Sequence, residues 1–283
     1  MLAPFTPHQW NLGRNRSLEL GPLGHIMGVI NATPDSFSDG GMLASPAHAA
    51  LYAEKLVLDG ASILDIGAES TRPGAANVSG DEERARLLPI LDAIVSALPD
   101  AVISVDTYRA STAEVALKAG AHIINDVWGL QKEPDIANIA SEHGCGLVIM
   151  HTNREREALE DIVEDQKAFF GKSLEIANKA GISDSQIVLD PGFGFGKETA
   201  EINFQLLGRF DELLALGFPF LVGTSRKRFL GAGVELPYKN RDLATSATTS
   251  LLRSKGASIF RVHDVAINAE VLRICDAMLA QLR

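Results

Sequence analysis

The sequence predicts an α/β fold, a (β/α)₈ TIM barrel with an N-terminal β-hairpin that covers the barrel floor. Eight short apolar runs recur along the 283 residues, and longer segments rich in Ala, Leu and Glu separate them. Every apolar run ends in polar or ionisable residues. A strand followed by a helix, repeated eight times, is typical of this barrel. A doubly wound open sheet is the alternative, but the Gly-x-Gly-x-x-Gly fingerprint of such a sheet does not follow the first run.

The eight predicted strands are short and dominated by Ile, Val and Leu, as expected for parallel strands buried on both faces. They cover residues 25–30, 62–67, 101–106, 122–127, 146–151, 187–191, 219–224 and 259–263.

Amphipathic helices are predicted between and after these strands, from the spacing of their apolar residues. They cover residues 46–58, 80–98, 111–119, 136–143, 159–180, 200–216, 241–254 and 265–282. Before the first strand, two alternating runs flank Gly13-Arg14-Asn15, which predicts a hairpin. No shift in composition marks a linker, so we expect one domain over residues 1–283, with residues 1–24 as its N-terminal extension.

Composition narrows the class of protein. Hydrophobic residues make up 46% and charged residues 22%, which is ordinary for a soluble enzyme. The formal net charge of −10 argues against nucleic acid or an anionic membrane as a partner. The two cysteines have no metal-binding or redox spacing, which favours buried thiols in a reducing, cytoplasmic setting. We expect neither a secretory signal nor a membrane span, since no apolar run approaches ~18 residues.

The first strand leads into an unusual polar loop. After Asn31, the segment Thr33–Gly41 contains Pro34, two adjacent glycines and a single large aromatic residue, Phe37. Proline and glycine disfavour both helix and central strand here. A solvated turn and a lid that closes over a ligand are equally compatible with this stretch.

Polar residues at the carboxyl ends of the strands should meet at one mouth of the barrel, where the chemistry of this fold takes place. Polar groups within apolar runs need partners, so together they predict a polar pocket. The groups within the apolar runs are Asp65, Asp106, Asn125 and Asp190. The polar residues at the strand ends or just beyond them also include Asn31, Arg72, Met150-His151, Ser225–Arg228, Arg261 and His263.

Two chemical halves can be distinguished in this pocket. Asp106, Asn125, Asp190 and Lys227 suit a flat heterocycle that carries N–H donors and carbonyl acceptors. Asn31, Arg72, Arg261 and His263 suit phosphate. The glycine-rich segment 190–197 lacks the Walker pattern, and its phenylalanines are better interpreted as apolar walls for a ring, with a plain connecting loop as the alternative.

Several segments, in order along nearly the whole chain, resemble the dihydropteroate synthases, the folate-pathway enzymes that sulfonamides target. The resemblance begins with Asn31-Ala-Thr-Pro-Asp-Ser-Phe-Ser-Asp-Gly-Gly41. It continues at residues 65–75, 104–107, 124–127, 189–197, 223–228 and 261–265. One departure is clear: the family continues from Met-His into Met-Gln-Gly-x-Pro, whereas Met150-His151 is followed here by Thr152-Asn-Arg-Glu-Arg156.

The resemblance implies the reaction and the residues that perform it. A hydroxymethyl-dihydropterin diphosphate would condense with p-aminobenzoate to give dihydropteroate and pyrophosphate, with Mg²⁺ on the diphosphate and Asn31 as its protein ligand. Lys227, Asp106, Arg261 and His263 would be catalytic. The implied substrate-binding residues are Phe37, Thr71, Arg72, Asp106, Asn125, Met150, Asp190, Phe195, Ser225, Lys227, Arg228, Arg261 and His263.

The resemblance also implies small-molecule substrates only, a homodimer, and loops 32–41 and 71–79 closing over p-aminobenzoate. Two alternatives stay open. A methyltransferase of the related pterin-binding barrels would carry a corrinoid, but it has no use for a phosphate-binding half. A non-catalytic pterin-binding paralogue has no need of Asn31, Arg261 and His263.

Overall fold

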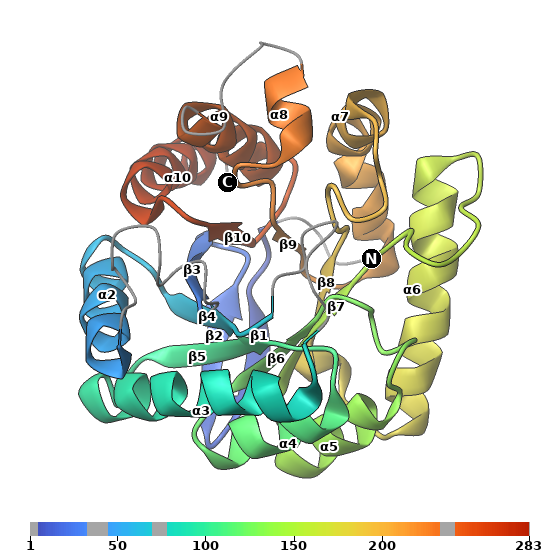
Figure 1. Ribbon diagram of the computed structural model, residues 1–283. Coiled ribbons are helices and arrows are strands. Elements are labelled where there is room, and N and C mark those ends of the chain that lie inside the picture. Colours follow the sequence, from blue (N-terminus) through green and yellow to red (C-terminus); the bar gives the residue numbers. More distant parts are fainter. Residues whose placement is uncertain (1–4, 33–44, 70–77, 233–240, 283) are drawn as a thin grey trace.

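The structure is a computed structural model that describes residues 5–32, 45–69, 78–232 and 241–282. Its main sheet has eight parallel strands in the order β8-β7-β6-β5-β4-β3-β10-β9, and helices surround them (Figure 1). A bridge between Leu189 and Phe220 joins β8 to the segment entering β9, so the sheet closes on itself. The predicted TIM barrel is therefore confirmed.

The observed strands match the predicted runs to within about two residues, the usual uncertainty of such boundaries. They are β3 (His25–Asn31), β4 (Ile63–Gly67), β5 (Val102–Asp106), β6 (Ile123–Asp126), β7 (Gly146–Met150), β8 (Ile187–Asp190), β9 (Leu221–Val222) and β10 (Ile259–Val262).

The helices also follow the predicted pattern, and several of them start at a side-chain cap. Ser45, Ser79, Asp161 and Asp264 each accept a hydrogen bond from a backbone N–H in the first turn of the helix that follows. The helices are α2 (Pro46–Leu58), α3 (Gly80–Ala97), α4 (Ala110–Lys118), α5 (Asp135–His143), α6 (Ile162–Lys179), α7 (Ala200–Gly208), α8 (Arg228–Ala232), α9 (Arg241–Ser254) and α10 (Val265–Ala280).

Two details differ from the prediction. The helix expected over residues 200–216 is divided into α7 and a 3₁₀ helix, η2 (Phe210–Leu216). The division follows Gly208, a poor helix former, and it turns Phe210 into the core, where that side chain is fully buried. The short helix α8 and the 3₁₀ helix η1 (Asp184–Gln186) were not predicted, because neither is long enough to show a period.

The N-terminal hairpin covers the floor of the barrel, as expected. It consists of β1 (His8–Gly13) and β2 (Arg16–Leu20), joined at Arg14 and Asn15. Both turn residues have positive φ, 49° and 56°, the backbone conformation that matches the twist of a two-residue hairpin. Trp10, Leu12 and Leu20 pack in one buried cluster with residues from the amino-terminal parts of the strands, so the opposite, carboxyl end is left for the chemistry.

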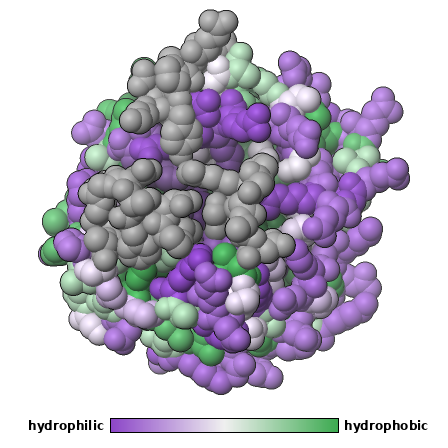
Figure 2. All heavy atoms as spheres, in the orientation of Figure 1, coloured by the Kyte–Doolittle hydropathy of each residue, from purple (hydrophilic) through white to green (hydrophobic). Residues whose placement is uncertain are grey.

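The described surface in Figure 2 is mostly hydrophilic, with hydrophobic residues in small separate groups. No helix in the described ranges has the length and apolar character required to cross a membrane.

Candidate active site

The interior of the barrel changes from apolar to polar in a single step along four strands. Side chains two residues apart in a strand point to the same side, so each residue two positions above the floor also faces the interior. On β4, β6, β8 and β10 the floor residues are Ile63, Ile123, Val188 and Ile259. The residues above them are Asp65, Asn125, Asp190 and Arg261.

Arg261 joins the two halves of the predicted pocket. Its Nε donates to Asp65 Oδ2 at 2.7 Å, and its Nη2 donates to Asp106 Oδ2 at 3.0 Å. The Asp65 side chain is fully buried, and those of Asp106 and Arg261 are 10% and 22% exposed. The structure therefore places Arg261, predicted for phosphate, against Asp106, predicted for the heterocycle.

Hydrogen-bond acceptors that lack a partner within the described part of the chain lie beside Asp65, Asp106 and Arg261. Asn125 Nδ2 contacts Asp65 Oδ2 at 3.4 Å. Asp65 Oδ1, Asn125 Oδ1 and Ser104 Oγ are buried without a hydrogen-bond partner among the described residues. Because unsatisfied buried polar atoms are costly, acceptors of this kind suit a ligand rich in N–H donors, or ordered water.

Asp190 and Lys227 belong to a second group, built on the loop after β8. Asp190 Oδ1 accepts a hydrogen bond from Gly192 N at 2.7 Å. Lys227 donates to the Phe193 carbonyl, and its Nζ lies 4.3 Å from the centre of the half-buried Phe195 ring. Arg154, a residue that sequence reasoning did not assign to the site, lies over the same ring at 4.8 Å.

Ser225 and His263 meet where β9 and β10 end. Ser225 Oγ lies 2.9 Å from His263 Nδ1 and also accepts from His263 N at 3.1 Å. The neighbouring Arg226 turns away to pair with Asp242 on α9. Arg228 is exposed at the first residue of α8. The basic run therefore divides between the pocket and the surface.

Met150 and Asn31 lie at the ends of their strands, as expected. Met150, the last residue of β7, is buried and pairs in register with Asp190. Asn31, the last residue of β3, is half-buried. Phe37, Thr71 and Arg72 lie outside the described residues.

Burial shifts the protonation of the pocket's charged groups. It raises the pKa of Asp106 to about 7, although the Arg261 guanidinium opposes the shift. Burial likewise lowers the pKa of Lys227 to about 7, opposed by Asp190. The pKa of Asp190 is raised by burial as well. Groups balanced between two protonation states near neutral pH are typical of functional sites.

The free energy of unfolding should therefore depend on pH through Asp106. Between about pH 4 and pH 7 the native state keeps a proton that the unfolded state releases, so its stability falls as the pH rises. A tenfold change in proton affinity corresponds to about 1.4 kcal/mol. We expect Asp106→Asn to lose less stability than the parent over this range, as measured by urea unfolding at several pH values. An unchanged slope would contradict the buried, proton-binding state of Asp106.

Sequence reasoning missed two features of this site: the contacts of Asp65, and the position of Arg154, in the loop after β7, over the Phe195 ring. Asp65 was recognised as a polar strand residue but not as a partner shared by Arg261 and Asn125. Its position two residues above Ile63, in a strand without alternation, was the available signal.

Among the described residues, no group of three or more His, Cys, Asp or Glu side chains is arranged to hold a metal ion.

Comparisons with known proteins place the chain in a family. The profile of the family described as pterin binding enzyme matches residues 27–263. The dihydropteroate synthase of Bacillus subtilis is 46% identical over 254 residues, which cover 90% of this chain and 88% of that protein.

Solved structures give the same relationship. A dihydropteroate synthase from Clostridium difficile, determined in the presence of pteroic acid, superposes with a TM-score of 0.88 at 43% identity, covering 92% of this chain and 98% of that one. The Xanthomonas albilineans enzyme with 4-aminobenzoic acid also has a TM-score of 0.88, at 36% identity, covering 97% and 99% of the two chains. With its fold, the order of its motifs and these relatives in agreement, this chain belongs to the dihydropteroate synthase family of pterin-binding enzymes.

Proposed function

We propose that this chain condenses 6-hydroxymethyl-7,8-dihydropterin diphosphate with p-aminobenzoate to give 7,8-dihydropteroate and pyrophosphate. The observation that carries the proposal is the joined polar layer above the barrel floor, in which Arg261 links Asp65 to Asp106 beside Asn125. This layer places acceptors for a heterocycle beside a cation for a diphosphate.

The pterin would bind along the acceptors. Asp106, Asn125 and Asp190 offer oxygens to its ring N–H and amino groups, and Lys227 offers a donor to its carbonyl. The open Asn125 Oδ1 supports this assignment, since a bound donor would satisfy it. Met150 and Phe195 would supply the apolar contacts to the faces of the ring.

The diphosphate would be held by Arg261, His263 and Asn31. A Mg²⁺ ion fits this arrangement through its preference for oxygen, because a single amide oxygen from Asn31 suffices when phosphates provide most ligands. When bound, the ion would neutralise charge on the leaving diphosphate. Arg72 and Thr71 would extend this side of the site, with Phe37 over the p-aminobenzoate.

The chemical step favours departure of pyrophosphate before attack, since an aryl amine is a weak nucleophile. The bond between the methylene carbon and the diphosphate oxygen breaks, and its electron pair leaves with pyrophosphate. The resulting cation is delocalised into the pterin. The amine lone pair then forms the C–N bond, and the amine proton passes to solvent. Asp106, Lys227, Arg261 and His263 contribute by placing fixed charges around the leaving group and the cation.

The decisive experiment is an assay of the purified chain with both substrates, following pyrophosphate release and dihydropteroate formation. Turnover that requires both substrates supports the proposal. Pterin binding without turnover would identify a non-catalytic paralogue, and the absorbance of a bound corrinoid would identify a methyltransferase.

Arg228 is our candidate partner for the carboxylate of p-aminobenzoate. It is exposed at the start of α8, directly after Lys227. We expect Arg228→Ala to raise the KM for p-aminobenzoate several-fold and to leave the KM for the pterin diphosphate nearly unchanged, because only one substrate loses an ionic contact.

Steady-state kinetics with each substrate varied in turn measures this effect. Arg209→Ala is the matched control, since the Arg209 side chain is also a cation, 39% exposed, and pairs with Asp161 and Glu212, neither of which is a predicted site residue. A joint rise of both KM values, or no rise in either, would remove Arg228 from the site.

We also propose a homodimer located in the cytoplasm. Helices α9 and α10, which contact one another, expose Leu243, Leu251, Ile274 and Met278 at 72%, 53%, 73% and 48%. Exposed apolar side chains on two helices that pack together favour a protein interface. Light scattering measures the mass of the assembly, and a homodimer has twice the 30.3 kDa mass of the chain.

The buried, unpaired Cys145 and Cys275 agree with a reducing compartment.

A further inference from the structure

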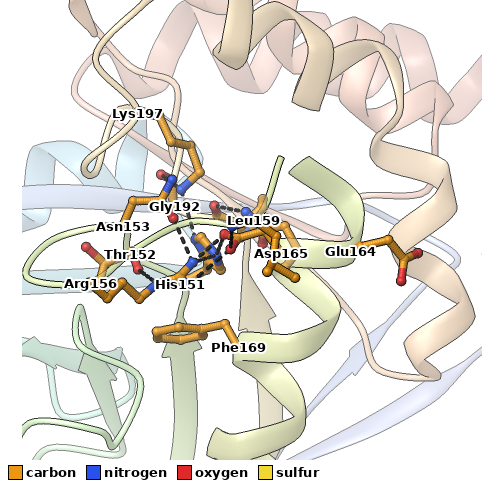
Figure 3. A network of polar contacts seen from close by, with 12 residues as sticks. His151, Thr152, Asn153, Arg156, Leu159, Glu164, Asp165, Phe169, Gly192 and Lys197 are labelled. Carbon is orange, nitrogen blue, oxygen red and sulfur yellow. Dashed lines mark hydrogen bonds and ion pairs between the residues drawn. The ribbon is translucent and has the colours of Figure 1, made fainter. Parts of the chain in front are cut away.

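A buried polar network lies behind the pocket wall, between the loops that follow β7 and β8 (Figure 3). It contains His151, Arg156, Asp165 and Lys197, and none of them belongs to the proposed substrate contacts. The His151 and Asp165 side chains are fully buried, and Lys197 is 2% exposed. Charged groups at this depth are costly unless each has partners, so the network calls for a physical account.

The network is continuous from the surface to the β8 loop, defined here as residues 191–197. Arg156 forms a two-pronged ion pair with Asp165, whose Oδ2 lies 2.9 Å from His151 Nε2. On the other side of the imidazole, Nδ1 lies 3.0 Å from Lys197 Nζ. Arg156 therefore forms the outer end of this network, and it belongs to residues 152–156, the segment that departs from the family pattern.

Lys197 and Lys227 act on neighbouring peptide groups of the β8 loop. Lys197 Nζ donates to the Gly192 carbonyl at 2.8 Å, and Lys227 donates to the carbonyl of the next residue, Phe193. Gly192 has a positive φ of 63° and packs directly on the His151 carbonyl, so no side chain fits there. The placement of the Phe193 carbonyl therefore depends on how Lys197 holds Gly192.

Further hydrogen bonds attach β8 and its loop to the β7 loop and to α6. His151 N donates to the Asp190 carbonyl at 2.8 Å, and Asn153 N donates to the Phe195 carbonyl at 3.2 Å. Gln166 Nε2 donates to the Pro191 carbonyl at 2.9 Å. Hydrogen bonds from the β7 loop and α6 thus fix the β8 loop at several points along its length. Lys197, itself a residue of this loop, adds a bond within it.

We propose that Lys197 and His151 are positioning residues for Lys227. They hold the β8 loop so that the Phe193 carbonyl keeps the Lys227 ammonium at the pocket, and Arg156 and Asp165 fix the His151 ring. The inference rests on the proposed contact of Lys227 with the pterin.

A double-mutant cycle tests this role, because two residues that act through one contact are not additive. Lys197→Met removes the terminal amino group and keeps a buried linear side chain. Calorimetry with unphosphorylated 6-hydroxymethylpterin should show roughly tenfold weaker binding, as expected when a buried hydrogen-bond donor is lost. In a Lys227→Met background, the same substitution should change the affinity by less than about twofold.

The matched control is Arg253→Met. Arg253 is also a fully buried cation, but it pairs with Asp276 and holds the Gly21 carbonyl beside the hairpin, away from the β8 loop. Its replacement should lower the melting temperature without changing pterin affinity. This result separates positioning from a general loss of stability.

Each contrary outcome is distinct. An equal loss of affinity from Lys197→Met in both backgrounds, or no loss in either, overturns the inference and leaves the proposed function intact. An unchanged affinity in Lys227→Met alone overturns the pterin role of Lys227 and the inference with it. If Lys197→Met does not fold, Arg156→Gln gives the same test, since the Arg156 side chain is 25% exposed and the glutamine amide keeps a hydrogen-bond donor for the buried Asp165.

Discussion

Replacement of Arg261 by alanine is expected to abolish turnover and to destabilise the chain. Arg261 bonds Asp65 and Asp106 at once, so its loss leaves two largely buried carboxylates without their cation. Breaking a buried pair on one side typically costs about 3–5 kcal/mol, because the remaining charge is uncompensated. The diphosphate loses a cationic contact in the same step. Urea unfolding and product formation at saturating p-aminobenzoate measure the two effects.

Arg261→Lys is the matched variant for this experiment. Lysine keeps the positive charge, but a single ammonium cannot reproduce the planar fork that reaches both carboxylates. We expect it to recover part of the lost stability and little of the turnover. If Arg261→Ala retained turnover within about tenfold of the parent, equivalent to 1.4 kcal/mol in the barrier, the diphosphate role of Arg261 would be wrong.

Replacement of Asp190 by asparagine is expected to weaken pterin binding strongly. Asp190 uses one oxygen for Gly192 N and stands close to Lys227, whose charged state it favours. Asparagine turns one acceptor into a donor, which would face the N–H groups of the heterocycle. A hydrogen bond to a charged group contributes about 1.5–3 kcal/mol, so the dissociation constant should rise roughly 10- to 100-fold.

Calorimetry with unphosphorylated hydroxymethylpterin isolates this effect from the diphosphate. Asp211→Asn is the matched control, since Asp211 pairs with Lys255 on the surface and should leave the affinity unchanged. A pterin affinity of Asp190→Asn equal to that of the parent would exclude Asp190 as an anchor of the ring.

The sequence by itself determined the barrel, the hairpin and the mouth at which the chemistry gathers. These follow from local regularities: apolar runs of strand length, helical periods between them, and polar residues where each strand ends. Asp65, Asn125 and Asp190 were recognised because a polar side chain inside an apolar run destabilises the fold unless it has a partner.

Only the tertiary structure decided which of these groups touch one another. Asp65 and Arg261 are 196 residues apart, and no spacing along the chain encodes their contact. The same holds for the Lys197–His151 pair, 46 residues apart, which looked like the ends of two unrelated motifs. Strand register and loop packing place such side chains, and both depend on closure of the whole sheet. Periodicity therefore predicted the strands and helices of this protein, whereas long-range packing determined which side chains contact one another.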